Sequence, residues 1–154
     1  MKKVFIFGSL NMDLVISSPR EVLQGETIHG EGFMTNGGGK GANQATACGK
    51  LGAKAFMGGC VGNDGFGQTL VSNLEKYGVD TSCVRAVDGV STGVAVILIV
   101  NHDNRIILDS GANGVAGKED VDRLLSLAEP GDYLLTQLEN RIETVGYALE
   151  AAKK

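Results

Sequence analysis

The sequence predicts an α/β fold in which a mostly parallel β-sheet is flanked by helices and a second, small β-sheet forms a separate layer. Short apolar runs alternate with segments of helical periodicity, as in successive βα units. Two stretches, near residues 14–35 and 92–110, instead contain only strand-forming runs. Glycine supplies 23 of the 154 residues and occurs in clusters, which indicates backbone brought close to a ligand.

The first predicted element is a buried strand at residues 4–7. This run is continuously apolar, as is typical of a central parallel strand covered on both faces. Asn11 and Asp13 follow it, and open α/β sheets bind their ligands at the carboxyl ends of such strands. Residues 14–17 predict a second short strand, and residues 27–35 predict a weak, glycine-broken strand at a sheet edge.

Residues 36–44, Asn-Gly-Gly-Gly-Lys-Gly-Ala-Asn-Gln, predict a glycine loop that leads into a helix from Ala45. Backbone N–H groups at such a helix start face an oxygen-rich ligand, with the Lys40 ammonium and the Asn43 amide nearby. An anion and a neutral polyol fit this loop equally well.

The same loop is similar in part to two phosphate-binding motifs. A Walker A loop requires Ser or Thr after Gly-Lys, and Gly41 occupies that position, which excludes the motif. Gly37-x-Gly39-x-x-Ala42 matches a relaxed dinucleotide fingerprint. A nucleotide-binding α/β domain therefore stays open as an alternative.

The remaining elements follow from periodicity and turn residues. We expect strands at residues 53–60, 92–100, 105–110 and 133–137, and helices at 66–77, 118–129 and 142–152. The Asn- and Asp-rich residues 101–104 favour a tight hairpin, which assigns both flanking strands to the small sheet. Glu139 follows the strand at 133–137, and we expect it to meet Asn11 and Asp13 at one sheet edge.

Composition excludes several classes of function. The formal net charge is −4 and no basic stripe occurs, which argues against nucleic acid as the main partner. The longest uncharged apolar run, residues 93–100, is far shorter than the ~20 residues of a membrane span. Asn11 and Asp13 interrupt the N-terminal apolar run, so no signal peptide is predicted. We expect one cytoplasmic domain over residues 1–154.

The cysteines and histidines predict no metal site. Cys48, Cys60 and Cys83 are odd in number and lack C-x-x-C spacing, so we interpret them as small buried hydrophobes. Neither His29 nor His102 has a second histidine four residues on, the spacing of a helical metal-binding face.

Short motifs along nearly the whole chain carry a family resemblance. They are Phe7-Gly8-Ser9-Leu10-Asn11-Met12-Asp13, Gly25-Glu26-Thr27, Gly37-Gly38-Gly39-Lys40-Gly41-Ala42-Asn43-Gln44-Ala45, Leu51-Gly52-Ala53, Val61-Gly62-Asn63-Asp64, Ser91-Thr92-Gly93-Val94-Ala95, Gly111-Ala112-Asn113 and Gln137-Leu138-Glu139. Together they resemble the N-terminal half of the PfkB-type carbohydrate kinases. The Gly-Gly-Lys-Gly-Ala-Asn-Gln string is most similar to the branch of that family that phosphorylates ribose.

The resemblance implies a ribokinase-like α/β fold and transfer of the γ-phosphoryl of ATP to a primary hydroxyl of a pentose, with O5 of D-ribose favoured and ribose 5-phosphate as product. It also implies a set of sugar-binding residues, namely Asn11, Asp13, Gly38, Gly39, Lys40, Asn43 and Glu139. The strands at approximately 14–18, 27–36, 92–100 and 105–110 resemble the family's lid, which covers the sugar and pairs with a second subunit. Every side chain of residues 94–100 is apolar, which also favours a lid-mediated homodimer.

The sequence departs from the family in one respect. Family members are longer, and their catalytic aspartate lies in a C-terminal Gly-Ala-Gly-Asp motif that does not occur here. ATP, Mg²⁺ and a monovalent cation are implied by the family, but their sites lie mostly in that missing half, so no catalytic, cofactor or metal residue is assigned. We expect the chain to be inactive alone.

The last predicted helix is not followed by the strand that a crossover helix normally leads to. We interpret the chain as part of a longer fold, and a C-terminal helix docked on a complete sheet is the alternative. A non-catalytic sugar-binding or dimerisation module is the second functional alternative.

Overall fold

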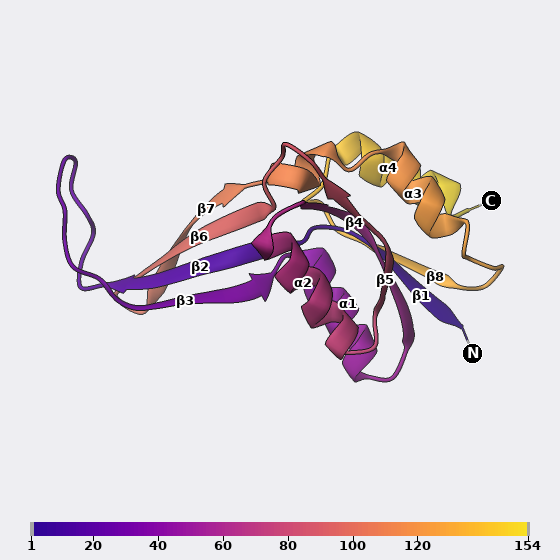
Figure 1. Ribbon diagram of the computed structural model, residues 1–154, viewed down its shortest axis with the longest axis horizontal. Coiled ribbons are helices and arrows are strands. Elements are labelled where there is room, and N and C mark those ends of the chain that lie inside the picture. The colour runs from indigo at the N-terminus through magenta and orange to yellow at the C-terminus, as the bar shows by residue number, and fades with distance from the viewer. Residues whose placement is uncertain (1, 154) are drawn as a thin grey trace.

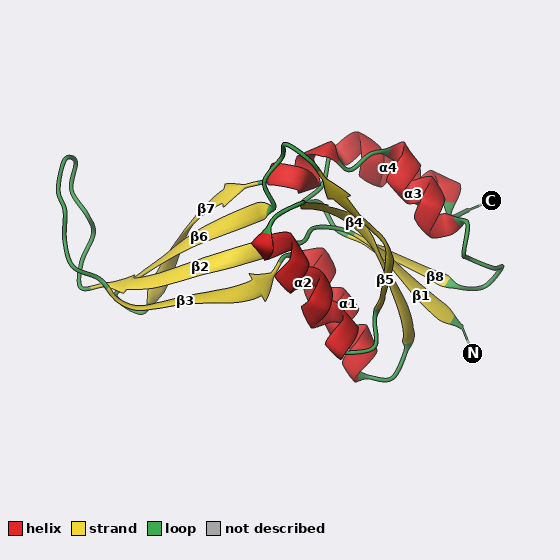
Figure 2. Cartoon of the chain, in the orientation of Figure 1, coloured by secondary structure: helices red, strands yellow, loops and turns green. Residues whose placement is uncertain are grey.

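The computed structural model describes residues 2–153 and contains two four-stranded sheets that extend away from one another (Figures 1 and 2). The main sheet is entirely parallel and has the strand order β5-β4-β1-β8. Its strands are β1 (Lys3–Phe7), β4 (Lys54–Gly62), β5 (Asp80–Val87) and β8 (Tyr133–Thr136). Helices cover both faces of this sheet, and they are α1 (Lys40–Lys50), α2 (Gly65–Lys76), α3 (Lys118–Leu125) and α4 (Ile142–Ala151).

The second sheet, which we call the lid sheet, is mixed and has the order β3-β2-β6-β7. Its strands are β2 (Asn11–Ser18), β3 (Glu31–Gly38), β6 (Gly93–Val100) and β7 (Asp103–Asp109). β2 and β6 are parallel, and the outer pairs are antiparallel. A parallel sheet with flanking helices and a separate small sheet is the fold class that the sequence predicts.

The alternation of side chains along β1 divides the core of the main sheet into two layers. Ile6 packs with α1 and α2 on one face, whereas Phe5 and Phe7 face α3 and α4 on the other. Phe5 also stacks on Phe56 of β4, with ring centroids 4.9 Å apart. All three β1 side chains are almost fully buried, as a continuous apolar strand between two helical layers requires.

The predicted hairpin between β6 and β7 is confirmed, and its turn is tight. Val100 pairs with Asp103, which leaves only Asn101 and His102 in the loop. Both have positive φ, 50° and 63°, the combination that a type I′ turn requires. Asn tolerates this region better than most residues, which explains the polar composition of the turn.

The glycine-rich segment differs from its prediction. β3 continues to Gly38 and α1 begins at Lys40, so the expected loop is reduced to Gly39 and the helix starts five residues earlier than Ala45. Gly39 has φ +89°, and a Cβ there would lie 2.7 Å from the Ser9 carbonyl oxygen. A single glycine therefore turns the chain directly from strand to helix, because only glycine fits this conformation and this close approach.

The boundaries of the lid strands also differ. β2 begins at Asn11 and not at Leu14, because Asn11 pairs with Gly38 on one side and Gly93 on the other. Residues 27–30 lie outside β3, and β7 spans Asp103–Asp109 in place of residues 105–110. Asn11 and Asp13 are therefore lid-sheet residues at the junction of the two sheets.

Sequence periodicity missed one strand of the main sheet. β5 lies at its edge, and only Cys83 of its eight residues is buried. Charged Asp80 and Arg85 interrupt its apolar character, so it lacks the continuous run that identifies β1 and β4.

The prediction that the cysteines are buried agrees with the structure. Cys60 and Cys83 are buried, and Cys48 is partly buried.

No helix formed by residues 2–153 is long and apolar enough to cross a membrane.

Candidate functional site

The junction between the two sheets brings together side chains that are distant in sequence. Glu139, in the bend after β8, accepts a hydrogen bond from Ser9 Oγ at 2.6 Å and another from the backbone N–H of Lys40 at 3.1 Å. Its other carboxylate oxygen forms an ion pair with the Lys40 ammonium. The carboxylate thus lies at the N-terminus of α1, where negative charge is favourable. Glu139 is therefore drawn to the junction by contacts with protein groups, and the charge on it also acts on Asp13.

These contacts fix the charge of Glu139. Burial raises the pKa of its carboxyl group, but hydrogen bonds from Lys40 and Ser9 outweigh burial and hold the pKa below its ordinary value. The Lys40 side chain is 64% exposed, so its ammonium can turn toward a ligand. Ser9 itself is buried and joins β1 to α1, since its carbonyl accepts the Ala42 N–H at 3.0 Å.

Asp13 has the opposite environment to Glu139. Its carboxylate accepts no hydrogen bond from residues 2–153, and it is not one of the buried polar groups without a partner, so it is accessible. Burial raises its pKa, and the nearby charge of Glu139 raises it further. Asp13 is therefore a partly desolvated acceptor whose hydrogen-bonding capacity is unused by the protein.

Gly38 and Gly39 make this arrangement sterically feasible. A Cβ at Gly38 would collide with the Asp13 carboxylate, and one at Gly39 would lie 2.8 Å from the backbone N of Asn11. The two glycines lie in the junction, next to Asp13 and Asn11. They allow the end of β3 to approach the site side chains on β2.

Asn11 is 4% exposed and is held by a residue that sequence analysis did not single out as part of the site. Asn113, in the 3₁₀ helix η1 (Gly111–Val115), donates to Asn11 Oδ1 at 2.7 Å. Both Ser9 and Asn113 belong to motifs that carry the family resemblance, so the motifs contained the signal. Periodicity could not reveal it because the contacts span 130 and 102 residues.

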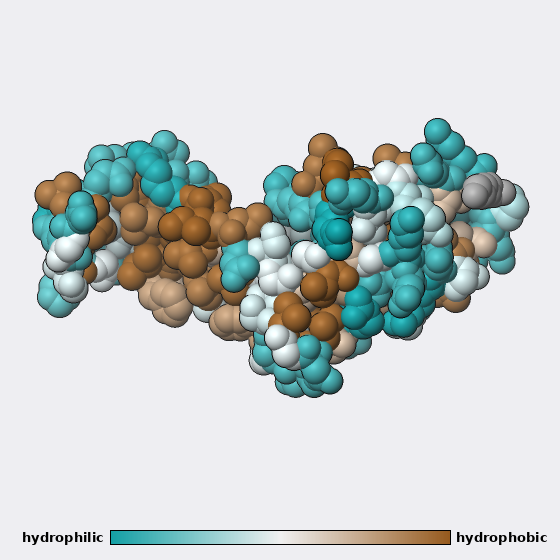
Figure 3. All heavy atoms as spheres, turned by 90° about the horizontal axis from the view of Figure 1, so that it is seen from above, coloured by the Kyte–Doolittle hydropathy of each residue, from teal (hydrophilic) through white to brown (hydrophobic). Residues whose placement is uncertain are grey.

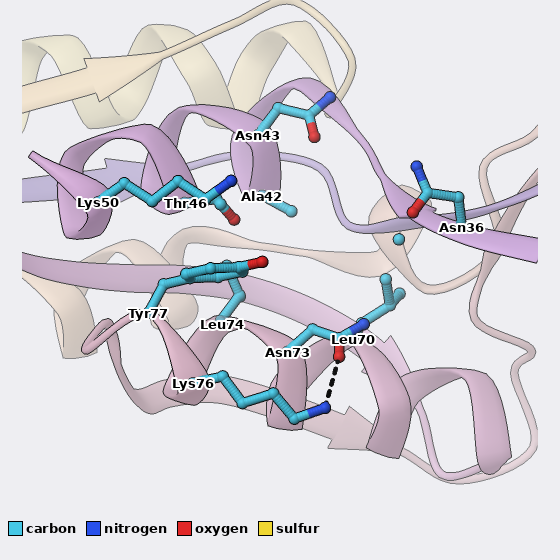
Figure 4. A pocket seen from close by; sticks show the side chains of 11 residues that line it. Asn36, Ala42, Asn43, Thr46, Lys50, Leu70, Asn73, Leu74, Lys76 and Tyr77 are labelled. Carbon is cyan, nitrogen blue, oxygen red and sulfur yellow. Dashed lines mark hydrogen bonds between the residues drawn. The ribbon is translucent and has the colours of Figure 1, made fainter.

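Asn43 lies apart from the other predicted site residues. It is exposed on α1 and lines a groove of about 490 Å³ between α1 and α2 (Figure 4). Asn36 closes one end of the groove, and Lys50 and Tyr77 form the other, where the ammonium lies 4.6 Å from the ring centroid. None of the hydrogen bonds around Glu139 includes Asn43.

The carboxyl end of β8 carries further polar groups without partners. Thr136 Oγ1, Gln137 Oε1 and both polar atoms of Asn140 are buried and form no hydrogen bond within residues 2–153. They flank Glu139 in sequence. Unsatisfied donors and acceptors are therefore concentrated at the sheet edge next to the candidate site.

The structure removes the support for a dinucleotide site. Gly37 belongs to β3, which pairs antiparallel with β2 in the lid sheet, and Gly39 follows that strand, whereas the fingerprint requires the first turn of a parallel βαβ unit. No group of three or more His, Cys, Asp or Glu side chains in residues 2–153 is placed to hold a metal ion.

Comparison with known proteins gives one family. Residues 1–151 match the model of the pfkB family carbohydrate kinases. Among curated relatives, the ribokinase of Schizosaccharomyces pombe is 42% identical over the whole chain and 51% of its own length. The deoxyribokinase of Salmonella typhi is 38% identical over 98% of the chain and 50% of its own length.

Solved structures agree in fold. The ribokinase of Thermotoga maritima superimposes on the whole chain with a TM-score of 0.86 and 36% identity, and the chain covers 50% of that structure. The chain therefore spans about half the length of the relatives that it matches.

Proposed function

The chain belongs to the pfkB family of carbohydrate kinases, and on this premise we propose that it forms the sugar-binding part of a kinase that phosphorylates D-ribose at O5. The family implies ATP as phosphoryl donor together with Mg²⁺. A cytoplasmic location and a lid-mediated homodimer belong to the same proposal.

One observation carries the proposal, namely the unused carboxylate of Asp13. A carboxylate can accept two hydroxyl hydrogens at once, and its bonds are about twice as strong as neutral ones. Asp13 is partly buried, accessible and free of protein donors within residues 2–153. A ligand with vicinal hydroxyl groups satisfies such an acceptor, as a pentose does.

The neighbouring residues then have distinct roles. Lys40 can donate to a sugar oxygen from its exposed ammonium, while its backbone N–H stays bound to Glu139. Glu139 has one oxygen engaged by two donors, so its other oxygen, shared with Lys40, is the one available to a sugar hydroxyl. Glu139 acts largely by holding the start of α1 in place.

Transfer of the phosphoryl group needs groups beyond this site. The resemblance assigns the catalytic base to a Gly-Ala-Gly-Asp motif, which these 154 residues do not contain. We therefore expect the chain alone to bind ribose weakly and to release no ADP in the presence of ribose and ATP. This leaves a non-catalytic sugar-binding module as the description of the chain in isolation.

The decisive experiment is a ribose titration of the chain and of Asp13→Ala, followed by NMR because weak binding is expected. Asp13→Ala should weaken binding by about 1.5–3 kcal/mol, roughly tenfold to 150-fold, the range for hydrogen bonds to charged groups. A turn or packing role predicts lower thermal stability with unchanged affinity. An Asp13→Ala chain that binds ribose like the wild type contradicts the site assignment.

Lys40→Ala separates two roles of the lysine in the same titration. Loss of a ligand contact lowers ribose affinity and leaves the melting temperature unchanged. Loss of the ion pair with Glu139 lowers both ribose affinity and the melting temperature.

The choice of sugar needs its own titration, because one relative is named a deoxyribokinase. Each ribose series should be accompanied by one with 2-deoxyribose, and tighter binding of 2-deoxyribose would contradict the choice of D-ribose.

The surface of the lid sheet supports the proposed dimer. Apolar side chains gather on it, as Figure 3 shows, and those between 44% and 74% exposed occur on both of its faces. By strand register, Met34, Ile106 and Leu108 project from one face and Phe33, Val96 and Ile107 from the other. Exposed apolar surface of this kind is typical of an interface. Sedimentation should find a dimer at micromolar concentration that Ile107→Asp dissociates, and a wild-type monomer at high micromolar concentration contradicts it.

A further inference from the structure

Asn113 lies at the root of the lid sheet and makes three hydrogen bonds to two consecutive residues. Its Oδ1 accepts from the Leu10 N–H at 2.9 Å, and its Nδ2 donates to the Leu10 carbonyl at 3.0 Å and to Asn11 Oδ1 at 2.7 Å. Asn113 is 2% exposed, and both of its Nδ2 hydrogens are used. It thus ties η1, which follows the last lid strand, to the start of the first.

This network determines which way each amide points. A backbone N–H can only donate, so the Leu10 N–H fixes the oxygen of Asn113 toward Leu10 and its nitrogen toward Asn11. The Asn113 nitrogen in turn requires an acceptor, which fixes the oxygen of Asn11. The Asn11 Nδ2 is then directed away from Asn113. The assignment rests on a chain of bonds that starts from a backbone donor and not on the amide geometry itself.

The Asn11 Nδ2 is left without a protein acceptor. No hydrogen bond within residues 2–153 is donated by it, and it is not among the buried polar atoms that lack a partner, so it is accessible. Asn11 and Asp13 are two apart on β2 and therefore project from the same face of the lid sheet. A donor and an acceptor are thus presented side by side.

The junction is built around this pair of amides. Gly93, the first residue of β6, pairs with Asn11 across the sheet, and a Cβ on it would collide with both Asn113 Nδ2 and Asn11 Oδ1. Gly111 has φ +45° at the start of η1, and a Cβ there would lie 2.9 Å from the backbone N of Gly93. β2, β6 and η1 must therefore approach one another closely for Asn113 to form its hydrogen bonds.

We propose that Asn113 is a positioning residue for the sugar site: it holds the Asn11 side chain with its amide nitrogen toward the ligand, so that Asn11 donates to a sugar oxygen while Asp13 accepts from sugar hydroxyls. The inference rests on the proposed function for the identity of the ligand. The amide orientation itself does not depend on it, which allows the two to be tested apart.

The test is heteronuclear NMR of the 16.0 kDa chain, in which side-chain amide signals of Asn11 and Asn113 are assigned and followed during a D-ribose titration. In the wild type we expect a hydrogen-bond coupling from Asn113 Nδ2 to the Asn11 side-chain carbonyl, and ribose-dependent shifts of the Asn11 amide signals. Asn113→Ala should abolish the coupling, broaden the Asn11 signals and weaken ribose binding by about tenfold, as for loss of one hydrogen bond.

A double-mutant cycle shows whether Asn113 acts through Asn11. Asn113→Ala should cause no further loss of affinity in an Asn11→Ala background, whereas its effect should add in full to that of Asp13→Ala. Thr144→Val is the matched control, since it removes another buried hydrogen bond, to the Ala116 carbonyl at 3.2 Å, without touching Asn11. The control should lower stability and leave the Asn11 signals and ribose affinity unchanged.

A second variant keeps the test decisive if Asn113→Ala does not fold. Asn113→Asp retains the acceptor for Leu10 but replaces the donor that faces Asn11, so the Asn11 amide should reverse and ribose affinity should fall. Unchanged Asn11 signals in a folded variant, or affinity losses that add in full in the cycle with Asn11, would overturn the inference. If ribose changes the chemical shift of no wild-type signal at Asn11, Asp13 or Lys40, the proposed function fails. The hydrogen-bond coupling between Asn113 and Asn11 then tests the orientation of the Asn11 amide by itself.

Discussion

A central strand of the main sheet and an edge strand of the lid sheet have opposite burial. In β4, at the centre of the main sheet, eight of nine residues are buried, whereas all seven residues of β7 in the lid sheet are exposed. β7 is the more polar of the two strands, but its apolar residues Ile106, Ile107 and Leu108 are exposed as well. The helices on both faces of the main sheet give the side chains of β4 a place to pack, and β7 lies at an edge of the lid sheet without such cover.

The two sheets separate the residues that stabilise the chain from those that are available for binding. Burial of apolar side chains in the main sheet contributes to folding of the isolated chain. Exposed apolar side chains on the lid sheet contribute little to folding of the isolated chain, because they stay largely in contact with solvent. Mutations in the two sheets should therefore separate stability from association.

The largest difference is expected between Phe7→Ala and Ile107→Ala. Phe7 is fully buried, and its truncation should reduce the free energy of unfolding by about 3–5 kcal/mol. Ile107 is 74% exposed, and its truncation should change that free energy by less than about 0.5 kcal/mol. Urea titration measures both. Similar losses in the two variants would show that the lid sheet packs against the chain itself.

The next largest effect is expected at Asp120, which joins α3 to the edge of the main sheet. Its carboxylate is 1% exposed and accepts two hydrogen bonds from Arg85, at 2.6 and 2.8 Å. Asp120→Ala should cost about 3 kcal/mol, near the lower end for breaking a buried pair, because Arg85 can turn toward water. Glu119→Ala, on the exposed side of α3, is the control and should be nearly neutral.

Asp120 also predicts the direction of acid sensitivity. Burial raises its pKa, but the hydrogen bonds from Arg85 and Gly117 outweigh burial, so its folded-state pKa lies below the ordinary value. A carboxyl group of this kind stabilises the fold above its unfolded-state pKa of about 3.9 and loses that contribution as the pH falls through the lower folded-state value. Urea titrations between pH 6 and pH 3, taken as roughly spanning this window, should show a smaller acid loss in Asp120→Ala than in the wild type, and equal losses would contradict the assignment.

A smaller effect is expected where the two sheets meet. Asp64 caps α2 by accepting the Gly67 N–H at 2.8 Å, and it also accepts from the backbone N and the hydroxyl of Thr92, just before β6. Asp64→Ala should cost about 1–2 kcal/mol, as for loss of an N-cap. Amide hydrogen exchange should accelerate at the start of β6 more than in β4. Asp88→Ala, an exposed partner of Asn63, serves as control.

The smallest effect is a gain at the tip of the β6–β7 hairpin. His102 has φ +63°, which is unfavourable for a side chain other than glycine. His102→Gly produces the Asn-Gly sequence preferred in type I′ turns and should raise stability by up to about 1 kcal/mol. His29→Gly, outside any positive-φ position, should give no gain in thermal melting. A loss of stability in His102→Gly would contradict the assigned turn.

Local sequence patterns predicted what local physics determines. Residues 4–7 form a strand because a continuous apolar run needs cover on both faces, and the turn at Asn101 follows from its tolerance of positive φ. Sequence patterns place the start of α1 too late, because Gly41 and Asn43 have low helix propensity. β5 was missed because an edge strand needs apolar residues on few positions.

The site was predictable only in part for a related reason. Asn11, Asp13 and Glu139 were identified from their places after strands, and the structure brings them to one junction. Their partners Ser9 and Asn113 were not, because no periodicity links residues more than a hundred positions apart. The carboxylate of Glu139 is hydrogen-bonded and that of Asp13 is not, and this difference depends on neighbours in space that the sequence does not reveal.

The position of β8 in the sheet has a consequence for how the chain folds. β1 and β8 are far apart in sequence, yet they are neighbours in the main sheet, where Leu134 pairs with Phe5. Pairings between such distant segments form slowly, because closing the long intervening loop costs entropy before the contacts between the strands contribute any stability. Glu139 lies just after β8, so its bonds to Ser9 and Lys40 form only once the segment that separates them has been synthesised. The candidate site therefore assembles later than the helices and the β6–β7 hairpin, whose contacts are local in sequence.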